Sequence, residues 1–472
     1  MKTDIDRLIF NIFETENDSH LIDFETQSGI PVWMIGRYYL MDYVITSKVF
    51  SSESPIRYRK VSLKAVSLLV GSLFKNIGNR RLKKHRQIIL YTINRKTLID
   101  GKFFNRYVDY FARTLNDDSY VIEQALLDWE SPYPRKNNDV VFDVIARVKS
   151  EIYGKFHKRR YFGIVTDLID YYLERVKRIL GISFTGPEKA NMVKYIAQQI
   201  CVSEYMARWV EKQITAETKV FIMVGAGFPY NYPVNTVLKK HNVVSVELQH
   251  GYITKTSVMY NYAEKILERK ETAAGLPDYI LTYGEWWNTQ MNCPIKKIAV
   301  GNPYHDYCFA DCRAAADDKK TITVLGAGHN TEKYIELTEY LTETFDDFNV
   351  VFRPHPGEIE MALPIVAEKG HKIRIDENNE IYDTLKRSFA VISEITTVLF
   401  EAIGIVEKII VWNNDYAKAL LPEHPFESFE QTEELSKIIY GKTTDNYKYS
   451  DFWRENWQQN YRDFIESVTN AR

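Results

Sequence analysis

From Lys219 onward, the sequence alternates between short apolar runs and longer polar or helical segments. The apolar runs are nearly continuous in Val, Ile and Leu, which is typical of parallel strands covered on both faces. Parallel strands need a crossover between them, so the pattern predicts an α/β fold with doubly wound domains. The runs are Val220–Val224, Val243–Leu248, Tyr279–Thr282, Ile298–Val300, Ile322–Leu325, Val350–Phe352, Ala390–Ser393 and Lys408–Val411.

The pattern is less regular before Lys219. Ile88–Ile93 predicts a further strand, and apolar residues at helical spacing predict a helix over 103–115. Amphipathic periodicity over 138–215, including Asp139–Ile152 and Gly163–Leu180, predicts a long helical insertion.

Two later segments bear on domain organisation. Asp306–Lys320 is polar, rich in Ala and Asp, and lies between two α/β stretches, so it is expected to link two domains. Aromatic and apolar residues spaced four apart in Phe452–Val468 predict a terminal helix that packs on a domain surface.

The charge balance excludes some classes of partner and location. The 472 residues include 61 basic and 63 acidic side chains, so no global charge attracts nucleic acid, and none is expected as a partner. Four cysteines fit a reducing compartment. The longest nearly apolar run, Ala65–Phe74, is too short for a membrane span of about 20 residues. We therefore expect a soluble, cytoplasmic protein.

One stretch departs from this balance. Residues 54–99 contain no Asp or Glu and carry twelve Lys and Arg side chains. The favoured interpretation is a helix with a solvated basic face, followed by a buried strand. The alternative is peripheral contact with an anionic membrane, at the inner face of the cytoplasmic membrane, or with an anionic acceptor.

The first candidate site follows an expected strand that contains Glu247. The strand ends in Gln249, His250, Gly251 and Tyr252. Ligands of open α/β sheets sit at the carboxyl ends of strands, where a histidine can act as a base or a neutral hydrogen-bonding group. The alternative is a histidine that only satisfies loop carbonyls.

The second candidate site is Arg353-Pro354-His355-Pro356, again directly after an expected strand. The prolines fix the backbone that presents the arginine and the histidine. A rigidly presented cation and imidazole suit a phosphate or carboxylate group. The alternative is a stiff loop whose arginine forms a surface ion pair.

The third candidate site joins an expected strand to a helix and contains Ser393, Glu394, Thr396, Thr397 and Glu401. Hydroxyls at a helix start can contact phosphate, where free N–H groups already favour an anion. A glutamate about two turns further on could reach a ribose hydroxyl. The alternative is that the hydroxyls only cap the helix and the glutamate is solvated.

Two short glycine turns also follow expected strands. Gly225 and Gly227 form one, and Gly326 and Gly328 form the other. Neither is a full dinucleotide fingerprint, but both allow the backbone to approach a ligand closely. The sequence has no motif with metal-ligand spacing, so no metal site is expected.

The order of these motifs resembles bacterial surface-polysaccharide glycosyltransferases of the GT-B fold, over roughly residues 219–415. The His-Pro motif is similar to that of CMP-sialic acid and CMP-Kdo transferases, and the His-Gly and Arg-x-His-Pro pair resembles CDP-glycerol glycerophosphotransferases. The motifs that carry the resemblance are Gln249-His250-Gly251, Tyr283-Gly284-Glu285-Trp286-Trp287, Val300-Gly301-Asn302-Pro303, Arg353-Pro354-His355-Pro356 and Ser393-Glu394-x-Thr396-Thr397-x3-Glu401-Ala402.

The resemblance implies two Rossmann-like domains that face a cleft. Residues 1–305 would form the acceptor-side domain with its helical insertion at about 138–215, and residues 318–448 the domain that binds the nucleotide donor. Residues 449–472 would cross back to the N-terminal domain as a helix.

The resemblance also implies site roles. His355 would contact the donor phosphate, and His250 would face the reaction centre. The catalytic base stays open between His250, Glu247 and Asp100, because Asp100-Gly101 keeps only one acid of the sialyltransferases' acidic pair. The remaining donor-side residues would be Arg353, Pro356, Ser393, Glu394, Thr396, Thr397, Glu401, Gly326 and Gly328, and the acceptor-side residues Gln249, Gly251, Tyr252, Gly225, Gly227 and Arg95.

The expected activity is transfer of a sugar from a nucleotide-activated donor, CMP-linked such as Kdo or sialic acid, to a capsule or lipopolysaccharide glycan. The expected partners are the nucleotide-sugar, which is a co-substrate and not a cofactor, and a glycan or lipid-linked glycan acceptor. The alternatives on this scaffold are a CDP-polyol phosphotransferase, a pyruvyltransferase, a sugar-nucleotide epimerase and a non-catalytic glycan-assembly component.

Tyrosine is abundant, with 32 residues. Tyr230, Tyr232, Tyr252 and Tyr283, with Trp286 and Trp287, follow glycine turns or strand ends. Aromatic side chains at a cleft mouth can stack on sugar rings, so these residues are expected near a saccharide.

Overall fold

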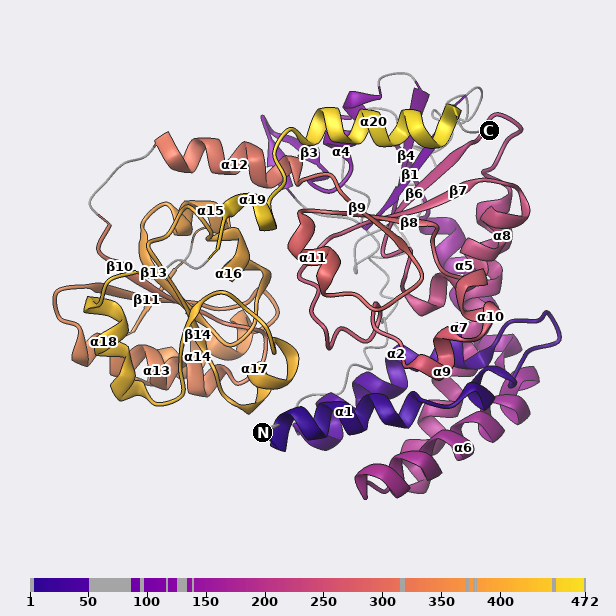
Figure 1. The fold of residues 1–472 in the computed structure, drawn as a ribbon, viewed down its shortest axis with the longest axis horizontal. Helices are drawn as coiled ribbons and strands as arrows, with labels where there is room; N and C mark the ends of the chain where they lie inside the picture. Colours follow the sequence, from indigo (N-terminus) through magenta and orange to yellow (C-terminus); the bar gives the residue numbers. More distant parts are fainter. Residues whose placement is uncertain are drawn as a thin grey trace.

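The apolar runs pair into two separate parallel sheets in the computed structural model (Figure 1). Arg95 and residues 54–85 of the basic stretch lie outside the described residues, so the expectations for them stay untested. The structure describes residues 4–50, 86–93, 97–115, 118–124, 134–137, 140–314, 319–369, 373–376, 378, 380–443 and 447–470.

The first sheet has seven strands in the order β5-β4-β1-β6-β7-β8-β9, all parallel to their neighbours. A separate antiparallel hairpin, β2 and β3, follows β1. The bounds are β1 Ile88–Thr92, β2 Thr97–Ile99, β3 Lys102–Phe104, β4 Ser119–Glu123, β5 Val140–Phe142, β6 Val220–Val224, β7 Val244–Leu248, β8 Tyr279–Thr282 and β9 Lys296–Ala299.

The second sheet has six parallel strands in the order β12-β11-β10-β13-β14-β15. In each sheet the chain starts centrally, runs to one edge and then returns past its first strand, as in the Rossmann fold. The bounds are β10 Thr321–Leu325, β11 Asn349–Arg353, β12 Arg374–Ile375, β13 Ser388–Ser393, β14 Lys408–Trp412 and β15 Glu427–Phe429.

Helices cover both faces of the first sheet. One face packs against α4 (Asp109–Thr114) and α20 (Trp457–Asn470), through residues such as Phe111 and Phe464. The opposite face packs against α7 (Gly186–Glu211) and α8 (Tyr232–Lys240). The continuous apolar character of the strands follows from this two-sided burial.

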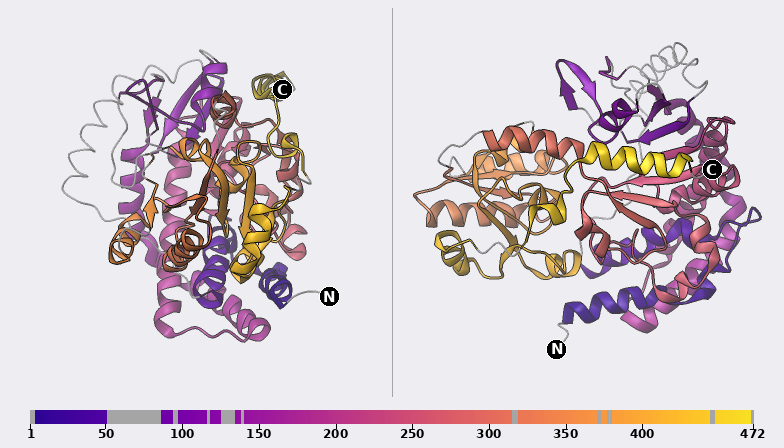
Figure 2. Two further views of the ribbon diagram at one scale, coloured as in Figure 1. Left: turned by 90° about the vertical axis from the view of Figure 1, so that its left-hand side faces the viewer. Right: turned by 45° about the horizontal axis from the view of Figure 1, so that its top comes forward.

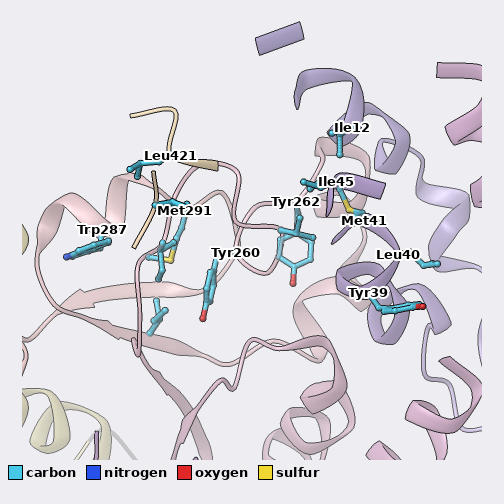
Figure 3. Packing of buried hydrophobic residues seen from close by; sticks show 14 of the residues in the cluster. Ile12, Tyr39, Leu40, Met41, Ile45, Tyr260, Tyr262, Trp287, Met291 and Leu421 are labelled. Carbon is cyan, nitrogen blue, oxygen red and sulfur yellow. The ribbon is translucent and has the colours of Figure 1, made fainter. Parts of the chain in front are cut away.

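The second sheet is covered in the same way. Its outer face buries side chains of α13 (Thr331–Thr344), α14 (Ile359–Glu368) and α18 (Leu435–Tyr440). Its other face and the short helices beside it join a core cluster shared with the N-terminal half, part of which is shown in Figure 3. Those helices are α15 Ile381–Leu385, α16 Thr397–Glu401 and α17 Asp415–Leu420.

The remaining helices belong to the N-terminal half (Figures 1 and 2). The expected helix over Asp139–Ile152 is wrong at its start, because 140–142 form β5, at the edge of the first sheet. The helix expected over 103–115 is also wrong in its first half, because β3 and a turn precede α4. The bounds are α1 Asp4–Glu16, α2 Val32–Tyr43, α5 Val144–His157, α6 Phe162–Leu180, α9 Glu264–Leu267, α10 Lys270–Ala274 and α11 Glu285–Thr289.

The chain passes between the two halves twice. The first passage is α12 (Pro303–Ala314), so most of the polar segment expected to be a link is helical. The second lies between α19 (Tyr449–Phe452) and α20, which breaks the single helix expected over 452–468. The two passages meet where the His305 ring stacks on Trp453 with centroids 3.9 Å apart.

A fully buried ion pair fixes the N-terminal helices to the loop that follows β7. Arg37 donates to both carboxylate oxygens of Glu16, at 2.6 and 2.9 Å, and neither side chain is exposed. The same guanidinium donates to the carbonyls of Val258 and Asn261, and Trp33 Nε1 donates to Glu16 at 3.0 Å. The cluster therefore joins α1, α2 and the 258–261 loop.

We predict that Glu16→Gln lowers the free energy of unfolding by about 3–5 kcal/mol, because it leaves a buried guanidinium without its counter-charge. Urea denaturation followed by circular dichroism would measure the loss. The matched control replaces both partners with apolar residues, Glu16→Leu with Arg37→Met, and should recover most of the stability. A loss below about 1 kcal/mol, the usual value of an exposed pair, would contradict the prediction.

Candidate active site

A cavity of about 330 Å³ lies between the two halves, at the carboxyl ends of strands from both sheets. Both sheets meet the condition for a ligand crevice in open α/β folds. The lining residues are Arg106, Tyr107, His250, Tyr283, Asn302, Tyr304, Leu325, Gly326, Arg353, Pro354, His355, Pro356, Glu380, Ile381, Thr396, Thr397, Val398 and Glu401.

His250 enters the cavity from the loop after β7. Its ring lies 5.5 Å from that of Phe228 and, edge to face, 6.4 Å from that of Tyr107. Gln249 does not line the cavity but braces the loop: it accepts from the Tyr283 N–H and donates to the Gly251 carbonyl, both at 2.9 Å. The sheet and the bracing glutamine thus fix where the imidazole lies.

Arg106 is a lining residue that sequence reasoning missed. Its guanidinium lies 5.3 Å from the Tyr107 ring centroid and 5.7 Å from that of Tyr304. Burial acts to lower the pKa of Arg106, but Tyr107 and Glu401 outweigh it and raise the pKa above its usual value. Its one signal was a cation close after a short strand, which the helical periodicity of 103–115 obscured.

Glu401 faces Arg106 from the other half of the molecule. Burial and the nearby Glu380 raise the pKa of the Glu401 carboxyl, whereas Arg106 acts to lower it. Tyr304 donates to Glu380 at 3.0 Å. The solvated glutamate considered as an alternative is therefore absent: Glu401 is a cavity residue beside a cation.

Arg353 lines the cavity but is held by protein groups. Its Nη1 donates to Asp376 and to Thr384 Oγ1, both at 2.8 Å, and to the Asn378 carbonyl at 3.0 Å. The ion pair is largely buried, unlike the surface pair considered from sequence. Arg353 thus fixes the loop beside the cavity as well as contributing positive charge to it.

His355 has a defined tautomer. The Gly357 N–H donates to His355 Nδ1 at 3.1 Å, so the proton of the neutral ring is on Nε2. The His355 N–H donates to Glu358 at 2.6 Å. A Cβ on Gly326 would overlap that carboxylate, and Gly328 has φ +85° with His355 Nδ1 beside it. Both glycines are therefore required for packing around the His-Pro loop.

The third motif divides into cavity and framework residues. Thr396 accepts from the Val398 N–H as the N-cap of α16, and Thr397 Oγ1 accepts from the Tyr252 N–H across the two halves at 3.2 Å. Ser393 and Glu394 are buried and do not line the cavity. Ser393 donates to the Leu325 carbonyl at 2.9 Å, and Glu394 is bonded to His329 at 2.8 Å.

The other two candidate bases lie elsewhere. Asp100 is at the tip of the β2–β3 hairpin, where it pairs with Lys136 at 2.7 Å and is largely exposed. Glu247 is fully buried: it accepts from Tyr260 and, at 2.6 Å, from the Gly227 N–H. Its side chain supports the Gly225–Gly227 turn, and neither turn glycine lines the cavity. Of the three candidates, only His250 reaches the cavity.

The aromatic residues expected near a saccharide divide into side chains that pack inside the protein and side chains that are partly exposed. Tyr232 is buried and donates to the Glu271 carbonyl, and Trp286 and Trp287 pack on Phe400 between the halves. Tyr230 and Tyr252 are each 36% exposed.

Two observations concern ions and membranes. Among the described residues, no group of three or more His, Cys, Asp or Glu side chains could hold a metal ion. Within the same part of the chain, no helix is both long and apolar enough to cross a bilayer. A second cavity, of about 450 Å³, lies by α1 and the 289–292 turn and shares no lining residue with the first.

Comparisons with known proteins give weak similarities. No family model and no curated protein matches the chain. The UDP-N-acetylglucosamine 2-epimerase from Rickettsia bellii is 12% identical, covers 82% of this chain and 97% of its own, and has a TM-score of 0.44. The glycosyltransferase from Rickettsia africae ESF-5 is 12% identical, with 82% of this chain and 100% of its own covered and a TM-score of 0.42. The wall teichoic acid polymerase TagF is 13% identical, with 87% of this chain and 97% of its own covered and a TM-score of 0.39. Similarities at this level do not bear on function.

The placement of Glu247 predicts a pH effect on stability. Burial raises the pKa of its carboxyl to about 7, against 4.5 ordinarily, although Tyr260 and Gly227 act to lower it. The stability that the neutral carboxyl contributes is fully present below about pH 4.5 and is lost as the pH rises through about 7, a change on the order of 3 kcal/mol.

We therefore predict that Glu247→Gln, which cannot ionise, gains stability relative to the natural protein between about pH 5 and pH 8. Chemical denaturation at several pH values would measure the difference. Glu217→Gln, at an exposed position, is the control and should leave the pH dependence unchanged. A constant difference between Glu247→Gln and the natural protein across this range would contradict the prediction.

Proposed function

We propose that this protein is a nucleotide-sugar-dependent glycosyltransferase whose donor and acceptor meet in the 330 Å³ cavity. The observation that supports this most is that polar side chains of both halves line the same cavity. His250 and Arg106 come from the N-terminal half. His355, Thr397 and Glu401 come from the C-terminal half. An imidazole opposite a set of anion-binding groups suits a reaction in which a hydroxyl attacks and a nucleotide phosphate leaves.

The donor side stabilises the leaving group. Negative charge grows on the nucleotide phosphate as the glycosidic bond breaks, and fixed cations and N–H donors stabilise that charge. Arg106 supplies a cation, and His355 supplies the Nε2–H that its tautomer leaves for donation. Glu401 is assigned to a ribose hydroxyl, because it lines the cavity and acts electrostatically on Arg106.

The acceptor side supplies the base. His250 removes the proton of the acceptor hydroxyl as the sugar is transferred, a role worth typically about 10²–10⁴-fold in rate. Gln249 and the packed rings of Phe228 and Tyr107 hold the imidazole for this step. Asp100 and Glu247 are not assigned to this role because they are outside the cavity.

The finer identity rests on motif similarity. We propose a CMP-linked donor, such as Kdo or sialic acid, and a capsule or lipopolysaccharide glycan as the acceptor, because the His-Pro motif is similar to that of CMP-dependent transferases. Such an enzyme would work in the cytoplasm, at the inner face of the cytoplasmic membrane.

Donor binding is tested by thermal shift with CMP, CDP, UDP and GDP. A nucleotide at a hundred times its Kd stabilises the folded protein by about 2.7 kcal/mol. We predict that CMP gives the largest shift and that Arg106→Ala and His355→Ala each abolish most of it.

Matched controls are Arg178→Ala and His157→Ala, which change the same residue types at exposed positions of α6 and α5. They should shift as the natural protein does. If no nucleotide shifts the natural protein, donor binding is wrong; if the cavity variants shift normally, the assigned site is wrong.

Turnover without an acceptor tests the reaction class. We predict that the protein leaves a CMP-sugar intact over the time in which an added acceptor is glycosylated, apart from slow hydrolysis, and that His250→Ala removes transfer but keeps the nucleotide thermal shift. Nuclear magnetic resonance of the sugar would follow both. Isomerisation of a nucleotide-sugar alone would indicate an epimerase instead.

A further inference from the structure

A cluster of aromatic side chains extends from His250 along the N-terminal half, outside the donor cavity. The ring of Phe228 lies 5.5 Å from His250, 5.5 Å from Tyr230 and 6.0 Å from Tyr38. Tyr252, two residues after His250, is 36% exposed, as is Tyr230. Rings from α2, the turn after β6 and the loop after β7 thus lie together beside the proposed base.

An acidic side chain follows this cluster along α2. Asp42 follows Tyr38 by one turn of α2, so the two side chains lie on the same face of the helix. The carboxyl is half-buried, and within the described residues no group forms a hydrogen bond or ion pair with it. Burial raises its pKa to about 6.

The Asp42 carboxylate acts electrostatically on one tyrosine of each half. Burial and, to a smaller extent, Asp42 raise the pKa of Tyr252 to about 12. Burial, Tyr252 and Asp42, in this order, act to raise the pKa of Tyr416 on α17 of the C-terminal half. Tyr416 is positioned by its ring contacts with Phe50, at 5.1 Å, and His329, at 4.3 Å. Phe50 at the end of the π-helical segment that follows Tyr43 thus places this end of α2 beside Tyr416 of the C-terminal half.

The backbone at this point is also unusual. Directly after Tyr43, α2 continues as a π-helix over Val44–Val49. Such segments are rare and occur frequently at functional sites. Thr46 Oγ1 donates to the Asp42 carbonyl at 2.8 Å, which fixes the turn that carries the acid.

We propose that Tyr38, Asp42, Tyr230, Tyr252 and Tyr416 form the acceptor subsite, and that this subsite takes an uncharged, hydroxyl-rich saccharide. The inference rests on the proposed function, because it assumes that His250 receives the acceptor hydroxyl. We call these five residues the Asp42 subsite.

The chemistry of the Asp42 subsite selects by charge. Tyrosine rings stack on the apolar faces of sugar rings, and their hydroxyls can pair with sugar hydroxyls. A carboxylate accepts hydrogen bonds from sugar hydroxyls at both oxygens. A carboxylate for which the described part of the chain provides no cation repels an anionic sugar, so a uronic acid or phosphorylated acceptor would bind less well.

Direct binding measurements test this with defined probes. Methyl glucoside, methyl galactoside and methyl N-acetylglucosaminide are compared with methyl glucuronide by saturation-transfer nuclear magnetic resonance titration, in the presence of saturating CMP. We expect at least one neutral glycoside to bind about tenfold or more tightly than the glucuronide, because like charges in a partly buried site repel.

Variants separate the roles of charge and rings. Asp42→Asn should bring the glucuronide to within about twofold of the neutral glycosides, and Tyr252→Ala should weaken all of them. Asp167→Asn, which makes the same charge change at an exposed position of α6, is the control and should keep the selectivity.

The failures of the two proposals are distinguishable. If CMP shifts the melting temperature but the glucuronide binds as tightly as every neutral glycoside, the Asp42 subsite is wrong and the donor site stands. Unchanged binding in both Asp42→Asn and Tyr252→Ala would overturn the subsite equally. If CMP gives no shift, the proposed function fails before the subsite is tested.

Discussion

Every strand that belongs to either main sheet runs parallel to its neighbours, and this constraint decides where chemistry can occur in the molecule. Parallel strands deliver all of their carboxyl ends to one edge, where loops carry polar side chains that the buried strands cannot hold. Here the corresponding edges of two sheets face a shared cavity. A histidine, a cation and a carboxylate can converge there although they are separated by up to about 300 residues in the sequence.

The polar residues of the cavity are held mainly by the protein itself. Arg353 is fixed by Asp376, the His355 loop by Glu358, and the His250 loop by Gln249. Groups fixed before a ligand arrives do not have to reorganise when charge develops during a reaction. Several residues of the sequence motifs therefore act indirectly: they position the residues that line the cavity.

The sequence was sufficient for the frame of the fold and for part of the site. All eight strands predicted after Lys219 are present. Short continuous apolar runs between polar segments are typical of parallel strands that are buried on both faces. His250, Arg353 and His355 were predicted because each follows such a strand directly. Glu247 was harder to judge: alternate strand residues point to opposite faces, and sequence alone does not say which face meets the ligand.

The residues that the sequence did not reveal depend on tertiary structure. Arg106 lies in a segment whose spacing indicated a helix, and only folding places it opposite Glu401. Asp42 lies in an apolar helix, and the role proposed for it depends on tyrosines that come from three other segments. The strand Val140–Phe142 was hidden in the same way, since three residues before a long helix carry no period of their own.

The double passage of the chain between the halves has a mechanical consequence. A single connection would let one half rotate about any axis through it relative to the other half. Here two connections cross and touch at His305 and Trp453. Motion that keeps both connections intact is rotation about a line through them. Any relative motion of the two halves would thereby be restricted in direction, so that the same residues would face each other across the cavity.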